Sequence, residues 1–297
     1  MRIPLPNERS ANCEPSTTWS LRDRTLSFGK EPLLMGILNV TPDSFSDGGN
    51  FYTVQSAVDR AKQIEDEGAG ILDLGGESTR PYSLPVDTEE ELKRVVPILE
   101  KLQGKIAIPI SIDTTKSEVA AAAMELGASI INDVSGLEAD PRMVEVAVDF
   151  GAGVCAMHRK GTPQTMQDNP QYDDVVEEIL SYLRATKTRL IGCGISPEKI
   201  CLDPGIGFGK THEHNLQLLQ HAVRFHETEC PILVGHSRKG FIAKILGNKD
   251  LPRTMGTVGV SMALALQRIQ ILRIHDVAEH RQAIQCFIAS LTNSSQP

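Results

Sequence analysis

The chain has 297 residues, of which 40% are hydrophobic, 23% charged and 4% aromatic, so it can bury a large core of mainly aliphatic side chains. Its formal net charge of −8 argues against nucleic acid or an anionic membrane as a partner of the whole surface, so an anionic substrate must be bound by local basic groups. No apolar run reaches the ~18 residues of a membrane span, and the six cysteines include no Cys-x-x-Cys pair. We therefore expect a cytoplasmic protein with free thiols.

Residues 1–30 are polar and irregular, and we expect a short hairpin between Trp19 and Phe28. We treat them as an N-terminal extension, residues 31–292 as one domain and residues 293–297 as a C-terminal tail. Within the domain a short apolar run, a polar or glycine-rich loop and an amphipathic stretch repeat in turn. The apolar runs are Leu33–Leu38, Ile71–Leu74, Ile108–Ile112, Ile130–Ile131, Gly153–Met157, Ile200–Leu202, Pro231–Val234 and Ile271–Ile274.

The stretches between the runs have helical spacing. Apolar residues at positions 54, 57, 58, 61 and 64 form one stripe before Gly68, a second stripe spans Leu92–Leu102, and the longest spans Val175–Leu190. Strands without polar alternation, each followed by a helix, indicate a parallel sheet covered on both faces. Eight such units over about 260 residues predict a (β/α)₈ TIM barrel. The alternative, an open doubly wound sheet that binds a dinucleotide, lacks the expected G-x-G-x-x-G after the first run.

Polar groups stand at the end of every apolar run. One Asn or Asp at such a place is usually a turn or a helix cap, but eight in succession indicate a site, because all these ends meet at the C-terminal face of a barrel. The groups are Asn39, Glu77–Arg80, Asp113, Asn132 and Asp133, His158, Asp203, His236–Lys239, and His275 and Asp276.

The chemistry of these groups divides by charge. Cationic and imidazole donors suit a diphosphate, whereas carboxylates in a barrel mouth need a partner with N–H groups. The sequence therefore predicts a phosphate pocket beside an acidic pocket for a nitrogen-rich ring. A Schiff base at Lys239, as in aldolases, is the alternative chemistry. The donors are Arg80, Arg238, Lys239, Arg273 and His275, and the acidic and amide groups are Asp113, Asn132 and Asp203.

At these residues the sequence resembles the dihydropteroate synthase family. The most specific matches are the segments Met35–Gly49, Asp73–Pro81 and Asp203–Lys210. Shorter matches are Ser111–Thr114, Ile131–Asp133, Met157–His158, Ser237–Lys239 and Arg273–Val277. They follow the family order over roughly residues 33 to 290. Where the family usually has a Gly-Ala pair before the last strand, this chain has Gln267–Gln270.

The resemblance implies an enzyme that joins (7,8-dihydropterin-6-yl)methyl diphosphate to 4-aminobenzoate and releases diphosphate, in folate biosynthesis, and that is a target of sulfonamides. It implies a Mg²⁺ ion held by Asn39, and diphosphate binding by Arg273 and His275. The pterin would be bound by Asp113, Asn132, Met157, Asp203 and Lys239, and 4-aminobenzoate by Thr79, Arg80, Pro81, Phe208 and Ser237. Among these, Asp113, Asp203, Lys239, Arg273 and His275 are the expected catalytic residues.

The resemblance also implies a homodimer formed by the late helices. We expect the loops Thr41–Phe51 and Ser78–Pro85 to close over the substrates and exclude water. Two other functions stay open at this stage: a corrinoid-dependent, pterin-binding methyltransferase and a catalytically silent pterin-binding paralogue. Release of pyrophosphate that depends on 4-aminobenzoate distinguishes the synthase from both.

Overall fold

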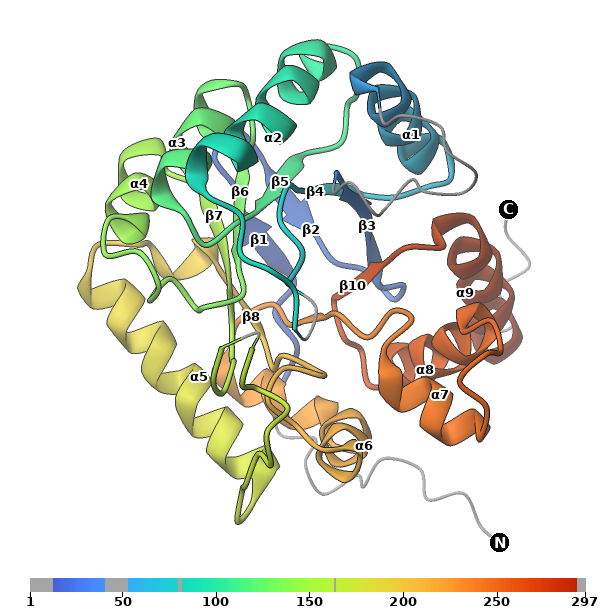
Figure 1. Ribbon diagram of the computed structural model, residues 1–297. Coiled ribbons are helices and arrows are strands. Elements are labelled where there is room, and N and C mark those ends of the chain that lie inside the picture. Colours follow the sequence, from blue (N-terminus) through green and yellow to red (C-terminus); the bar gives the residue numbers. More distant parts are fainter. Residues whose placement is uncertain (1–12, 41–52, 80–81, 163, 293–297) are drawn as a thin grey trace, which may run out of the picture.

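A computed structural model describes residues 13–40, 53–79, 82–162 and 164–292. Eight parallel strands form its centre, and Figure 1 shows the helices in a ring around them. The sheet order is β8-β7-β6-β5-β4-β3-β10-β9, and a bridge between Leu202 and Ile232 joins its two ends. The strands are β3 (Leu33–Asn39), β4 (Ile71–Gly75), β5 (Ile110–Asp113), β6 (Ile130–Asp133), β7 (Gly153–Met157), β8 (Ile200–Asp203), β9 (Leu233–Val234) and β10 (Ile271–Ile274). The predicted (β/α)₈ barrel is confirmed.

The helices follow the predicted stripes. In α1 the buried residues Ala57, Val58, Ala61 and Ile64 face the sheet, and the chain leaves the helix through Gly68, which has a positive φ of 98°. The longest helix is α5, as predicted. The helices are α1 (Val54–Asp66), α2 (Thr88–Leu102), α3 (Ser117–Glu125), α4 (Met143–Phe150), α5 (Val175–Gly192), α6 (His212–Gln220), α7 (Gly240–Leu246), α8 (Thr254–Leu266) and α9 (Val277–Thr292), with 3₁₀ turns η3 (Pro197–Lys199) and η4 (Ala222–Thr228). Among the described helices, none combines the length and the apolar character needed to cross a bilayer.

An antiparallel hairpin of β1 (Thr18–Ser20) and β2 (Thr25–Ser27) closes the N-terminal end of the barrel. Trp19 is fully buried and donates from its indole N–H to the carbonyl of Lys199 at 2.9 Å. It packs with Leu21 against the lowest layer of inward side chains, which are Met35, Ile71, Ile130, Cys155, Cys201, Leu233 and Ile271. The hairpin therefore belongs to the same core as the barrel floor.

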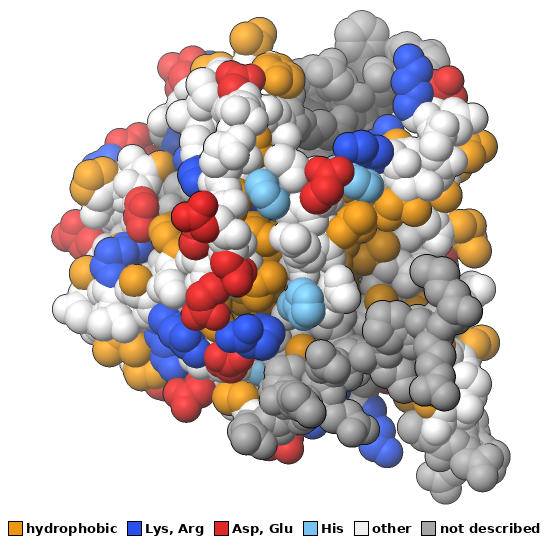
Figure 2. Space-filling view, turned by 90° about the horizontal axis from the view of Figure 1, so that it is seen from below, with side chains coloured by type: hydrophobic (Ala, Val, Ile, Leu, Met, Phe, Trp, Pro, Cys, Tyr) orange, Lys and Arg blue, Asp and Glu red, His pale blue; other side chains and the backbone are white. Residues whose placement is uncertain are grey.

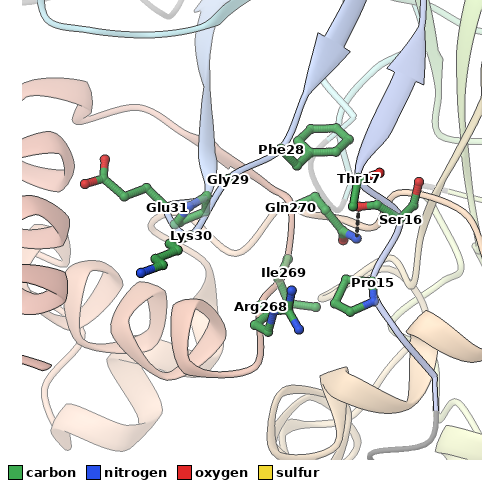
Figure 3. Close-up of a pocket in the computed structure, with 11 residues that line it drawn as sticks. Pro15, Ser16, Thr17, Phe28, Gly29, Lys30, Glu31, Arg268, Ile269 and Gln270 are labelled. Carbon is green, nitrogen blue, oxygen red and sulfur yellow. Dashed lines mark hydrogen bonds between the residues drawn. The ribbon is translucent and has the colours of Figure 1, made fainter. Parts of the chain in front are cut away.

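The turn before β10, where the chain departs from the family pattern, is held by glutamine side chains. Arg268 takes a left-handed φ of 57°, a conformation that glycine adopts without cost. Gln267 accepts from the backbone N–H of Val223 at 3.0 Å and donates to the carbonyl of Leu219 at 2.8 Å. Gln270 donates to the carbonyl of Ser16 at 3.1 Å, across a pocket of about 20 Å³ that the N-terminal segment helps to line (Figure 3). These bonds fix the start of the last strand without a glycine.

The surface agrees with the charge balance of the sequence. On the face in Figure 2, acidic and basic side chains are interspersed among the described residues and form no broad basic patch there. All six cysteines are unpaired thiols.

Candidate active site

Strand register brings the polar residues into one layer near the C-terminal end of the barrel. Asn39 pairs with Gly75, Gly75 with Asp113, and Asp113 with Asn132 along four neighbouring strands. A side-chain carbon added at Gly75 would lie 3.5 Å from Oδ1 of Asn39 and 3.4 Å from Cβ of Asp113. Glycine at this position therefore leaves space between two predicted site residues.

Arg273 is the centre of a buried charge cluster. Its Nε donates to Oδ2 of Asp73 at 2.6 Å and its Nη2 to Oδ2 of Asp113 at 2.5 Å, while Nδ2 of Asn132 is 3.3 Å from both oxygens of Asp73. Burial raises the pKa of Asp113 to about 7. The charge of Arg273 opposes this rise, whereas the neighbouring carboxylate of Asp73, which shares the same guanidinium, adds to it. The other oxygen of Asp113, Oδ1, is buried without a hydrogen-bond partner among the described residues. It is an acceptor that the described protein groups leave unused, in a residue that lines the central cavity.

Lys239 lies between this acidic cluster and an aromatic ring. Burial lowers the pKa of Lys239 to about 7, against the attraction of Asp203. The ammonium group donates to the carbonyl of Ile206 and lies 4.4 Å from the ring centre of Phe208. Burial also raises the pKa of Asp203, and the positive charge of Lys239 opposes this rise. Oδ1 of Asp203 accepts a hydrogen bond from the N–H of Gly205 at 2.7 Å.

Two pairs of residues connect the ends of β9 and β10. The hydroxyl oxygen of Ser237 accepts from the backbone N–H of His275 at 3.2 Å and lies 2.9 Å from Nδ1 of the same residue. Arg238 forms a two-pronged ion pair with Asp276, with Nε 3.0 Å from Oδ2. Arg238 has a φ of 56°, so this contact holds a left-handed residue at the site.

Several of these residues line a cavity of about 1230 Å³. Its lining includes eight predicted site residues, namely Asn39, Thr79, Asp113, Phe208, Ser237, Lys239, Arg273 and His275. Asn132, Met157 and Asp203 are almost completely buried, each 5% exposed or less, and none of the three is among the lining residues. Arg80 and Pro81 lie outside the described residues, as does the loop at residues 41–52, so the predicted loop closure stays a prediction.

Three polar groups at the run ends do not face this cavity. Asp133 accepts from the backbone and side chain of Ser135 at 2.6 Å, and His236 is fully buried with Nε2 2.8 Å from the hydroxyl of Ser261 in α8. His158 contacts the buried amine of Lys210. The run ends converge as the barrel requires, but the prediction that the polar groups there all form one site is wrong for these three side chains. Successive strand residues point to opposite faces, so only one of Asn132 and Asp133 can point inward.

Asp73 and Lys116 are functional candidates that the sequence analysis missed. Asp73 is completely buried in the middle of an apolar run, and that is the signal that could have identified it. Lys116 donates to Glu77 at 2.6 Å and to the buried Glu91 at 2.5 Å, and Glu77 also accepts from the N–H of Val86 at 2.9 Å. This ion-pair group fixes both ends of the loop that carries Thr79.

Known proteins resemble this chain over most of its length. A family model described as pterin-binding enzyme matches residues 35–275. Dihydropteroate synthase of Escherichia coli strain K12 is 44% identical over 88% of this chain and 92% of its own length, and that of a Synechocystis strain is 43% identical over 84% and 87%. The solved structure of the Yersinia pestis synthase with a sulfonamide drug has a TM-score of 0.86 and 40% identity over 93% of this chain and 99% of its own. That of Xanthomonas albilineans with 4-aminobenzoic acid has a TM-score of 0.85 and 41% identity over the same shares. The chain belongs to the dihydropteroate synthase family of pterin-binding enzymes.

Proposed function

We propose that the protein condenses (7,8-dihydropterin-6-yl)methyl diphosphate with 4-aminobenzoate to give 7,8-dihydropteroate and diphosphate. The observation that carries this proposal is the buried Asp73–Arg273–Asp113 cluster beside the cavity, with an unsatisfied oxygen on Asp113. A pterin has an edge of ring and amino N–H groups that can donate to such oxygens. Family membership supports the same reaction.

The acidic layer would bind the pterin ring. Asp113, Asn132 and Asp203 would accept and donate along its N–H edge, Met157 would pack on the ring, and Lys239 would reach its carbonyl. Three carboxylates, those of Asp73, Asp113 and Asp203, stand here against the two cations Arg273 and Lys239. The excess of acceptors favours a ring that presents several N–H groups.

Arg273, His275 and Asn39 would bind the diphosphate, since all three line the same cavity. No three His, Cys, Asp or Glu side chains of the described segments group into a metal site. A single amide oxygen nevertheless fits Mg²⁺, which is commonly held by one or two protein oxygens together with substrate phosphates and water. Asn39 would be that ligand, and the bound ion would neutralise part of the diphosphate charge.

The reaction breaks the bond between the exocyclic carbon and the diphosphate oxygen, and the electron pair leaves with the diphosphate. Arg273 and His275 would stabilise this developing charge. The electron-rich pterin supports a carbocation-like carbon, to which the amine nitrogen of 4-aminobenzoate donates its lone pair to form the new C–N bond. One amine proton is then lost to solvent. An aniline is unprotonated at neutral pH, so this path requires no strong base.

The 4-aminobenzoate would lie against Phe208, with Thr79, Arg80, Pro81 and Ser237 around it. A sulfonamide would compete for the same pocket. We also infer a cytoplasmic location, in keeping with the six free thiols. A homodimer through the late helices is supported by exposed apolar side chains near α7 and α8, including Ile245 at 53%, Leu251 at 45% and Met255 at 74% exposure.

A coupled assay for pyrophosphate tests the proposed reaction, with each substrate omitted in turn. We expect release only when both substrates are present, and a loss of release on addition of a sulfonamide that excess 4-aminobenzoate reverses. Pyrophosphate release without 4-aminobenzoate, or none with both substrates, would contradict the proposal. A borohydride-trapped adduct at Lys239 with a carbonyl substrate would favour an aldolase instead.

A further inference from the structure

Four successive backbone carbonyls at the cavity wall each accept a hydrogen bond from a different side chain. They belong to the segment 206–209, between β8 and α6. The donors are Lys239 to Ile206, Gln167 to Gly207 at 2.7 Å, Lys210 to Phe208 at 2.9 Å, and Tyr172 to Gly209 at 2.9 Å. Gln167 and Tyr172 come from the segment between β7 and α5, so distant parts of the chain converge on these four peptides.

The segment needs such support because of its backbone conformation. Gly205, Gly207 and Gly209 have φ values of 70°, 84° and 67°, which only glycine adopts readily. A side-chain carbon added at Gly209 would lie 2.3 Å from the carbonyl oxygen of Lys160. Alternating glycines have high conformational freedom in the absence of contacts, so the four donors select one conformation of the segment.

Lys210 and Gln167 hold the two peptide groups on either side of Phe208. The Lys210 amine is almost completely buried, at 2% exposure for the residue, and its other contacts are Nδ1 of His158 at 3.0 Å and the backbone carbonyl of His158 at 3.4 Å. The ring of His158 packs edge-on against Tyr182, with ring centres 4.7 Å apart. On the other side, the Gly207 N–H donates to Asn215 at 2.6 Å while its carbonyl accepts from Gln167.

We propose that Gln167 and Lys210 are positioning residues for the arylamine substrate. By fixing the peptides that flank Phe208, they hold its ring beside the ammonium group of Lys239, at 4.4 Å, and so shape the pocket for 4-aminobenzoate. This inference rests on the proposed function, and it adds two residues to the site whose side chains act through Phe208 and its neighbouring peptides.

The test is steady-state kinetics of the full-length Gln167→Leu variant. Loss of one hydrogen bond to a carbonyl predicts an increase of about fivefold to tenfold in the KM for 4-aminobenzoate. We expect kcat at saturating 4-aminobenzoate, and the calorimetric affinity for the pterin diphosphate, to stay within about twofold. The split separates positioning from general destabilisation, which would lower the active fraction and hence kcat without changing KM.

The matched control is Gln171→Leu, the same change four residues away. The Gln171 side chain is exposed and donates to Asn169, not to the glycine segment, so its variant should keep the wild-type KM. Lys210→Met should raise the same KM at least as much, but it disturbs a buried network and could fail to fold; Gln167→Leu carries the test in that case.

A wild-type KM for 4-aminobenzoate in an active Gln167→Leu enzyme would overturn the inference and leave the proposed function intact. A fall in kcat of the Gln167→Leu enzyme with an unchanged KM for 4-aminobenzoate would likewise overturn the inference and leave the proposed function intact. If the wild-type chain itself released no pyrophosphate, the proposed function would be overturned, and this inference with it.

Discussion

The two ends of the barrel are built from the same strands and yet have opposite chemistry. At the N-terminal end the inward residues are apolar, and Trp19 of the hairpin covers them. Two residues further along four of these strands the inward position becomes polar: Ile71 is followed by Asp73, Ile130 by Asn132, Cys201 by Asp203 and Ile271 by Arg273. The apolar layer contributes to stability, and the polar layer two residues further on supplies the charged groups proposed to bind the substrates.

The largest effect is expected at the polar layer. Arg273→Met leaves Asp73 and Asp113 buried without their cation, which for a broken buried ion pair costs about 3–5 kcal/mol of unfolding free energy. Protonation of Asp113, whose pKa is already raised, should keep the loss near the lower limit. Activity should fall by about 100-fold or more, because a group facing the leaving diphosphate is lost.

Denaturant unfolding and the pyrophosphate assay together measure these two losses. The double variant Arg273→Met with Asp73→Asn also removes one of the two buried carboxylates left without a cation. Part of the lost unfolding free energy should therefore return, while activity does not. If the double variant is no more stable than the single one, the unpaired carboxylates are not the cause of the lost stability.

The apolar layer should respond in the opposite way. Trp19→Ala removes a fully buried indole and its hydrogen bond to Lys199, a change that typically costs about 3–5 kcal/mol of unfolding free energy. The KM values for both substrates should stay within about twofold at temperatures where the variant is folded. A specific loss of substrate affinity in a folded Trp19→Ala enzyme would contradict the separation of the two layers.

The buried His236, which points away from the cavity, should make the unfolding free energy sensitive to acid. Burial lowers the pKa of His236 from 6.5 to about 3, so below pH 6.5 the unfolded chain binds a proton that the folded protein does not. Stability is therefore complete above about pH 6.5 and is lost as the pH falls toward 3, by about 2 kcal/mol at pH 5 for this residue.

The check compares the unfolding free energy of the wild type and of His236→Gln at pH 7.5 and pH 5. The glutamine can still bond to Ser261, and the variant should lose less stability on acidification. The difference between the two proteins cancels groups common to both, including Asp113, whose raised pKa favours the folded state as the pH falls through about 7. Equal acid sensitivity would exclude His236 as a cause.

The sequence predicted the strands because each is apolar on both faces, but for the same reason it did not show which residues point inward. Asp73 was missed although it stands midway between Ile71 and Gly75, both of which face inward. Asp133 and His236 were included although strand alternation turns them away. Gln167 could not have been found, since its contact with Gly207 depends on how two loops meet in space. Strand and helix positions follow from local patterns, whereas the supporting contacts of the site follow from tertiary packing.

The smallest predicted effect lies at the turn that leads from α8 to the start of β10, in the apolar layer. Arg268 has a φ of 57°, which costs an L-residue roughly 1–2 kcal/mol. Arg268→Gly removes this strain but increases the freedom of the unfolded chain, so we expect a net gain of about 0.5–1 kcal/mol in unfolding free energy. The ion pair with Glu14 that is lost is too exposed to contribute much. Arg268→Ala loses the same ion pair but keeps the strain, and it is the matched control in chemical denaturation. A glycine variant no more stable than the alanine variant would show that Gln267 and Gln270 already absorb the strain of this turn.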